Sequence, residues 1–281
     1  MLDILIHTLK ETINIIPFLF IAFIIIEYIE HKMTEKNEQI LKKAGKLGPV
    51  LGGLLGLIPQ CGFGVVATNL YITRIISLGS LISIYLATSD EMLLILIAEK
   101  APVSLIISIL LFKLIIGVVS GYIVDLLLRK RKKEKHIHEL CEHDDCHCEE
   151  KGIIKSSIIH TLKTTLFILI SLFIVNFIFH NYGEAYLSKI LLKNPIISPF
   201  ISSLIALIPS CGSSVILTET YLLEHIAFGT LISGLLTNSG IAIMLLFKNN
   251  KNLKENIIIL LTIYGIGVIS GIIINLITLI I

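Results

Sequence analysis

The chain has 281 residues, of which 54% are hydrophobic and 16% are charged, and its formal net charge at pH 7 is +2. Apolar runs long enough to cross a bilayer recur from one end to the other, so the composition predicts a multi-pass membrane protein. The basic residues stand beside apolar runs rather than on one soluble face, which gives no indication of nucleic-acid binding. The first apolar run continues to about Ile29 without a small-residue cleavage site, which predicts a retained helix rather than a signal peptide.

Four apolar segments precede a polar central stretch and four follow it. They cover residues 3–29, 47–73, 77–99, 102–128, 156–180, 196–223, 226–247 and 254–281. We therefore expect an all-α, polytopic fold with a first transmembrane repeat at 1–128, a loop at 129–152 and a second transmembrane repeat at 153–281. Ser89-Asp90 and Asn238-Ser239-Gly240 interrupt the third segment of each half.

The two halves repeat short phrases at a nearly constant spacing. IPQCGFGVVATNLY begins at Ile58 and IPSCGSSVILTETY begins at Ile208, an offset of 150 residues. GVVSG at Gly117 and GVISG at Gly267 keep this offset. An internal repeat of this size is a common way to build a secondary transporter, with the substrate site near the bilayer midplane where the repeats meet. Duplication without transport is the alternative.

Proline, cysteine and glycine interrupt an apolar segment at the same place in each half. Pro59 and Pro209 each remove a backbone donor, while Gly62 and Gly212 tolerate backbone angles that other residues resist. Backbone left unpaired inside a bilayer is tolerated only where protein or a water-filled cavity satisfies it. We therefore predict a discontinuous helix at each Pro-x-Cys-Gly phrase and a cavity between the two breaks.

Polar side chains within the apolar segments are the candidate substrate ligands, because charged groups in membrane spans are costly and often mark transport pathways. Asn69 stands eight residues after Cys61, and Glu219 stands eight residues after Cys211. This spacing puts each of them on roughly the same helix face as the cysteine of its own half. For the asparagines the alternative is hydrogen bonding between helices, and for the cysteines it is ordinary packing. The predicted ligand set is Cys61, Asn69, Asp90, Glu91, Cys211, Glu219 and Asn238.

The central loop concentrates imidazole, thiol and carboxylate groups. Such a composition predicts an auxiliary, flexible loop that captures zinc, cobalt, nickel or copper, and a solvated linker is the alternative. The candidate metal-binding residues of the loop are His136, His138, Cys141, His143, Cys146, His147 and Cys148.

Lysine and arginine are concentrated in three connectors, which follow the first segment, follow the fourth segment and precede the last one. Basic connectors are enriched on the cytoplasmic side of cell membranes. If these three connectors are cytoplasmic, the central loop is cytoplasmic too, and the two repeats cross the plasma membrane in opposite orientations. We therefore expect inverted repeats.

Two further basic residues lie in or beside the apolar segments. Arg74 aligns with Glu224 in the second half and is expected to snorkel or to pair at an interface. Lys113 lies in the middle of the fourth segment, where the second half has Ile263. We expect Lys113 to neutralise Asp90 or Glu91 when no substrate is bound.

The segments PQCGFGVVATNLYITR, YLATSDEMLLILI and PSCGSSVILTETYL resemble the signature segments of the ten-span heavy-metal exporters related to the ArsP permeases. Members of this family are labelled manganese transporters or arsenic efflux proteins. The resemblance covers nearly the whole chain and implies export of a metal or metalloid through two five-span repeats. It also implies signature roles at Cys61, Gly62, Asn69, Asp90, Glu91, Cys211 and Glu219.

Export of a heavy-metal ion is therefore the expected function, and manganese is favoured because oxygen donors outnumber thiols in the ligand set. Efflux of arsenite or an organoarsenical is the alternative, since paired cysteines suit trivalent arsenic. A membrane metal sensor or metal-delivery protein is the alternative of another class. The sequence contains no phosphate-binding loop, HExxH or GxSxG phrase, so we expect no enzyme and no cofactor. The expected partners are the metal or metalloid ion and the lipid bilayer, with no nucleic acid, and a homo-oligomer stays open.

Overall fold

The computed structural model describes residues 47–58, 61–89, 92–128, 194–209 and 211–280, with scattered residues between 9 and 24 and between 154 and 173. Every element in this part of the chain is an α-helix, so the expected all-α class is confirmed there. Among the described residues, three helical stretches are long and apolar enough to span a membrane: Val103–Leu127, Phe228–Asn249 and Leu253–Ile280. The predicted segments 3–29 and 156–180 lie mostly outside the described residues, and the loop 129–152 lies entirely outside them.

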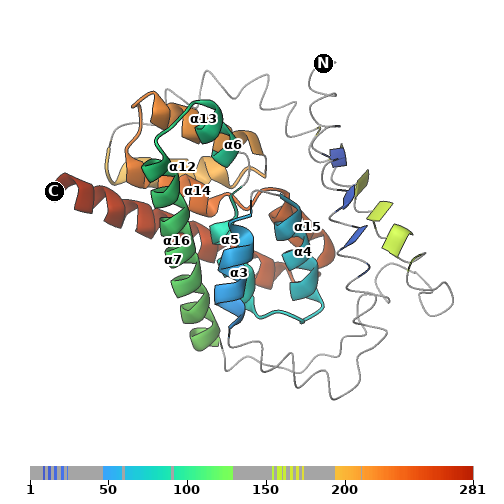
Figure 1. Cartoon of the computed structure of the whole chain (residues 1–281). Coiled ribbons are helices and arrows are strands. Elements are labelled where there is room, and N and C mark those ends of the chain that lie inside the picture. Colours follow the sequence, from blue (N-terminus) through green and yellow to red (C-terminus); the bar gives the residue numbers. More distant parts are fainter. Residues whose placement is uncertain are drawn as a thin grey trace.

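The described helices follow the same order in the two halves (Figure 1). The first half contains α3 (Gly48–Gly56), α4 (Cys61–Ile72), α5 (Leu78–Ala87), α6 (Met92–Ala98) and α7 (Val103–Leu128). The second half contains α12 (Ile197–Ala206), α13 (Cys211–Leu222), α14 (Phe228–Thr237), α15 (Ile241–Asn249) and α16 (Leu253–Ile280). Helices α13 and α14 begin and end 150 residues after α4 and α5.

Helices α3 and α4 form a hairpin. Helix α3 runs beside α5 in the same direction, since Gly48 packs against Ser80 and Gly56 packs against Ala87. Helix α4 returns towards the start of α5, because only the short turn 73–77 joins the two helices. The predicted segment 47–73 therefore enters and leaves at one end of the molecule.

Contacts at the helix ends fix the directions of the two longest helices. At one end, Arg74 in the turn before α5 pairs with Glu255 at the start of α16, 2.9 Å away. Asp125, near the end of α7, accepts a hydrogen bond of 2.8 Å from a backbone N–H in the first turn of α5. At the other end, Asn275 near the end of α16 donates to the Pro195 carbonyl at 3.1 Å. The end of α7 and the start of α16 therefore both lie on the side of the molecule where α5 begins, and the two long helices cross at a steep angle (Figure 1).

Glycine pairs bring the long helices close to α5 and α14. A Cβ atom on Gly121 of α7 would lie 2.6 Å from the carbonyl oxygen of Gly79 in α5. In the second half, a Cβ atom on Gly271 would lie 2.6 Å from the carbonyl oxygen of Gly229. Small residues allow the close backbone approach on which helix packing in a bilayer depends. Helices α14 and α15 are almost wholly buried by their neighbours, whereas most of α7 and α16 is exposed on the outside.

A serine hydroxyl joins α3 to α5 and α12 to α14 at corresponding positions. Ser83 donates to the Pro49 carbonyl at 2.6 Å, and Ser233 donates to the Pro199 carbonyl at 2.9 Å. Ser233 is also 2.6 Å from the hydroxyl of Ser203. Each of these hydroxyls satisfies its own hydrogen-bonding capacity inside the protein, as an apolar surrounding requires.

We predict that Gly121→Ala lowers the melting temperature of the purified protein, because the added methyl group meets the Gly79 carbonyl. Overpacking of this kind costs about 1–3 kcal/mol, or several degrees for a chain of this size. Gly265 in α16 is the matched control, since a Cβ atom there has no neighbour within 4 Å. Gly265→Ala should leave the melting temperature unchanged or raise it slightly, as alanine favours helix. Equal effects of the two substitutions would contradict the proposed close approach.

Candidate functional site

The third apolar segment of each half is interrupted at its centre. Helix α5 ends at Ala87 with Thr88 as its C-cap, and α14 ends at Thr237 with Asn238 as its C-cap. The side-chain oxygen of Asn238 accepts a hydrogen bond of 3.1 Å from the Gly240 N–H. Gly240 has φ 55° and ψ −140°, a conformation that favours glycine. Helices α6 and α15 begin immediately beyond these two interruptions.

The second apolar segment of each half is divided as well. Helix α3 ends at Gly56 and α4 begins at Cys61, while α12 ends at Ala206 and α13 begins at Cys211. The Ser89 N–H donates to the Gly56 carbonyl at 3.2 Å, so the end of α3 is bonded to the second residue after α5. The two interruptions of the first half therefore lie next to each other.

The predicted helix-break residues stand at these divisions. Gly62 lies in the first turn of α4 and is buried, and Gly212 lies in the first turn of α13. Pro209 lies between α12 and α13. Pro59, Asp90 and Glu91 lie outside the described residues, as do the side chains of Cys61 and Cys211.

Lys113 connects the two halves at the level of the interruptions. This residue of α7 is only 1% exposed, and its ammonium group donates to the carbonyl of Thr88. It also donates to the carbonyl of Leu235 in α14, at 3.0 Å. The expected pairing with Asp90 or Glu91 concerns residues outside the described part of the chain. The contact with Leu235, across the two halves, was not predicted from the sequence.

Helices α4 and α15 pack side by side with their N-termini at the same end. Gly64 lies against Ala242 near the start of both helices, and Asn69 bonds to Asn249 farther along both. The hydroxyls of Thr68 and Tyr85 are 2.5 Å apart, and each is 3.3 Å from the Ala242 carbonyl. The sequence analysis did not predict the contact between Thr68, Tyr85 and the Ala242 carbonyl. A tyrosine in an apolar run was the available signal, because a buried tyrosine hydroxyl usually needs a hydrogen-bond partner.

The other predicted ligands lie in different surroundings. Asn69 is 1% exposed, and its side-chain oxygen is 3.4 Å from the amide nitrogen of Asn249. Its own amide nitrogen has no partner among the described residues. Asn238 is buried in the α14–α15 interruption, whereas Glu219 is exposed on α13. No hydrogen bond joins these three residues to one another within the described ranges.

No group of three or more histidine, cysteine, aspartate or glutamate residues forms a metal site in the part of the chain that the structure describes. The predicted metal-binding loop from His136 to Cys148 falls outside that part. The ligand set and the loop both remain predictions.

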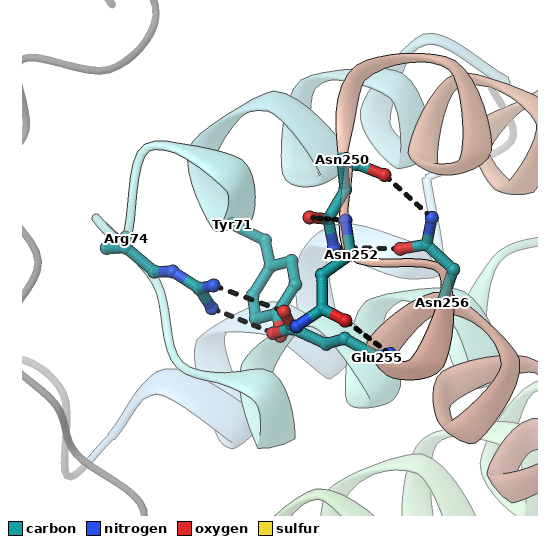
Figure 2. Close-up of polar contacts among 6 residues, drawn as sticks. All are labelled: Tyr71, Arg74, Asn250, Asn252, Glu255 and Asn256. Atoms are coloured by element: carbon teal, nitrogen blue, oxygen red, sulfur yellow. Dashed lines mark hydrogen bonds and ion pairs between the residues drawn. The ribbon is translucent and has the colours of Figure 1, made fainter.

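The turn after α4 is joined to the start of α16 by a cluster of polar contacts, which we call the Arg74–Glu255 clamp (Figure 2). Arg74 donates from both terminal nitrogens to the two carboxylate oxygens of Glu255, at 2.9 and 3.2 Å. The hydroxyl of Tyr71 donates to the same carboxylate, and the Arg74 guanidinium lies 5.2 Å from the Tyr71 ring centroid. The hydrogen bonds to Glu255 raise the pKa of Arg74, which keeps the guanidinium charged. The expected interface pairing of Arg74 is therefore observed.

Three asparagines hold the turn that presents Glu255. The side chains of Asn250 and Asn256 bond at 2.8 Å, and Asn256 also donates to the Asn250 carbonyl at 2.9 Å. Asn252 accepts a hydrogen bond of 3.4 Å from the Glu255 N–H (Figure 2). The first half has leucine at residue 105, the position that corresponds to Glu255, so it has no matching carboxylate there.

We predict an energetic coupling between Arg74 and Glu255 of roughly 0.5–1 kcal/mol, the range for partly exposed, bidentate ion pairs. A double-mutant cycle of Arg74→Ala and Glu255→Ala, followed by thermal or denaturant unfolding, measures it. Glu224→Ala is the control, because Glu224 has φ 60° and Arg74 has φ 61° at the corresponding position. This control should be near neutral. Strict additivity of the two clamp substitutions would show that the ion pair contributes nothing.

The chain matches the family model described as "Putative, 10TM heavy-metal exporter" over residues 1–170 and again over residues 153–279. No curated protein and no solved structure matches the chain. The matched regions cover nearly all of the sequence, and the apolar helices of the fold agree with a membrane transporter. The chain therefore belongs to this family of ten-span heavy-metal exporters.

Proposed function

We propose that the protein exports a thiophilic heavy-metal ion or metalloid, which binds between the two halves through Cys61 and Cys211. The observation that supports this is the position of the two cysteines, since each is the first residue of a helix that follows an interruption. The N-terminal end of a helix carries partial positive charge and favours an anionic group such as a thiolate. Thiolates in turn select soft metals over hard ones.

Manganese is the second candidate, and it depends on oxygen ligands. Two of the predicted oxygen donors, Asn69 and Asn238, already accept hydrogen bonds from other groups, and Glu219 is exposed. Asp90 and Glu91 are then the donors on which a manganese site would rest. A site of two carboxylates suits a hard cation. A thiophilic cargo would therefore depend on the two cysteines, whereas manganese would depend on Asp90 and Glu91.

We also propose that the two halves cross the membrane in opposite orientations. The helix order recurs at a spacing of 150 residues in α4 and α13, and the end of α7 and the start of α16 both lie on the side of the molecule where α5 begins. Lys251 precedes α16 on this side of the molecule, and the sequence that follows α7 is basic. Basic connectors favour the cytoplasm, so this end and the loop 129–152 would be cytoplasmic. The histidines and cysteines of the loop would then concentrate metal on the side from which it is exported.

On this proposal the Arg74–Glu255 clamp closes the cytoplasmic end. It joins α4 of the first half to α16 of the second half, so loading from the cytoplasm would require the ion pair to separate. The corresponding position at the other end holds leucine and cannot form the pair. The protein would thus be held shut on one side by a polar contact that the other side lacks.

A metal sensor or metal-delivery protein is the alternative of another class. It would bind metal without moving it across the membrane, and it would not need divided helices in both halves. Net flux across a sealed vesicle separates the two functions. Membership of an exporter family favours transport.

We predict that Cys61→Ser and Cys211→Ser each reduce uptake of arsenite, zinc or cadmium into inside-out vesicles by about tenfold or more, the effect of losing about 1.4 kcal/mol of ligand binding. Asp90→Asn should reduce this flux less. With manganese as cargo, the order of the two effects should reverse.

Cys141→Ser in the loop is the matched control for thiol removal and should leave the flux at saturating metal unchanged. All variants must first be shown to be folded and inserted. Equal tolerance of the Cys61 and Asp90 substitutions would rule out the proposed site. Metal binding without flux in the unmodified protein would favour the sensor instead.

A further inference from the structure

The ammonium group of Lys113 lies at the C-terminal ends of two half-helices, one from each half of the chain. Thr88, whose carbonyl accepts one hydrogen bond, is the C-cap of α5. Leu235, whose carbonyl accepts the other at 3.0 Å, stands two residues before the end of α14. Lys113 itself is 1% exposed.

Both carbonyls lie where a helix leaves backbone oxygens without an intrahelical donor. The last four carbonyls of an α-helix lack such a partner, and the C-terminal end carries partial negative charge. Helix α14 ends at Thr237, so Ser239 is not available as the helical donor to the Leu235 carbonyl. Inside a bilayer, these oxygens must be satisfied by the protein or by a bound ion.

Oxygens of this kind have the chemistry of a monovalent-cation site. In transporters with discontinuous helices, freed carbonyls and the C-terminal ends of half-helices coordinate the coupling cation. A lysine ammonium provides a full positive charge and three donors on a flexible stem. It can therefore occupy the place that a sodium or potassium ion would otherwise take between the two half-helices.

Of the two long helices, α7 carries the buried lysine and α16 does not. Ile263 of α16 stands at the position that corresponds to Lys113, and it is fully buried. The carbonyls of α5 and α14 thus share one ammonium group, which comes from α7. A helix-packing role alone would not require a charge at this position, since the second half fills it with an apolar side chain.

We propose that the carbonyls of Thr88 and Leu235 belong to a monovalent-cation site between the two halves, and that the Lys113 ammonium is its resident cation. Lys113 is then a positioning residue that holds α5 and α14 together across the halves. The protein carries its own cation at this site, so metal export needs neither sodium nor potassium. The transport part of this statement rests on the proposed function, whereas the cation site does not.

The cation site is tested on the purified full chain without any transport measurement. Lys113→Ala should lower the melting temperature, and methylammonium or sodium should restore it in a saturable way, because the free cation replaces the missing ammonium. Lys113→Met, which refills the space without charge, should melt below the unmodified protein and should not respond to cations. Lys254→Ala is the control for removing an exposed lysine, and it should have no effect.

Transport is tested in proteoliposomes with the metal cargo alone. The unmodified protein should show the same flux in choline as in sodium or potassium media. Lys113→Ala should lose about tenfold or more of this flux, a loss of about 1.4 kcal/mol, and methylammonium should restore it.

Three results would overturn the proposal. The first is a Lys113→Met protein that melts and transports like the unmodified one. The second is a Lys113→Ala protein whose melting temperature and flux no cation restores. The third is an absolute need for sodium or potassium in transport by the unmodified protein. If Lys113→Ala does not yield folded protein, Lys113→Arg should fold and melt above Lys113→Met, and the reverse order would contradict the site. If the unmodified protein moves no metal, the proposed function fails and the melting experiment still decides the cation site.

Discussion

Backbone groups at a helix end within a bilayer have no water to bond to, and the structure satisfies them where its helices are interrupted. Ser89 donates to the last residue of α3, Asn238 accepts from Gly240, and Lys113 donates to carbonyls at the ends of α5 and α14. Each of these bonds replaces one that a continuous helix would have made internally. The rest of the described fold depends on this, because the divided helices can stay in an apolar surrounding only while their ends are paired.

The two halves are joined through their divided helices rather than through a flat interface. Helix α4 of the first half packs on α15 of the second, and α13 of the second half packs on α6 of the first. The long helices α7 and α16 lie outside this centre, and glycine pairs hold them close to α5 and α14 (Figure 1). A change in the relative position of the halves would therefore alter the α4–α15 contact, the Lys113 bonds and the Arg74–Glu255 clamp together. Movement of this kind is what alternating access requires of a transporter.

The sequence predicted the all-α class, and proline, glycine and short polar residues stand where described helices end and begin, because they act locally on the backbone. A discontinuous helix at each Pro-x-Cys-Gly phrase stays a prediction. The sequence also predicted that Arg74 would pair at an interface, but its partner Glu255 is 181 residues away and no local pattern identifies it. That Asn69 and Glu219 each share a helix face with the cysteine of their own half stays a prediction, because the two cysteine side chains lie outside the described residues and eight residues rotate a helix by about 80° beyond two turns. The exposure of the Asn69 and Glu219 side chains differs with the neighbouring helix. Helix α15 has nine residues and its Asn249 contacts Asn69 on α4. Helix α6 has seven residues, and Glu219 on α13, which packs against α6, is exposed. Tertiary packing of this kind is not encoded in the periodicity of a single segment.

Opposite orientation of the two halves is the central claim, and cysteine labelling at Lys100 and Lys251 tests it most directly. These exposed residues precede α7 and α16, the helices that occupy the same place in the two halves. Each would be changed to cysteine alone, in protein whose five native cysteines are serine, and labelled with a membrane-impermeant maleimide from one side at a time. Opposite orientation predicts that residue 251 reacts only from the cytoplasmic side and residue 100 only from outside. Reaction of both from the same side would contradict the account.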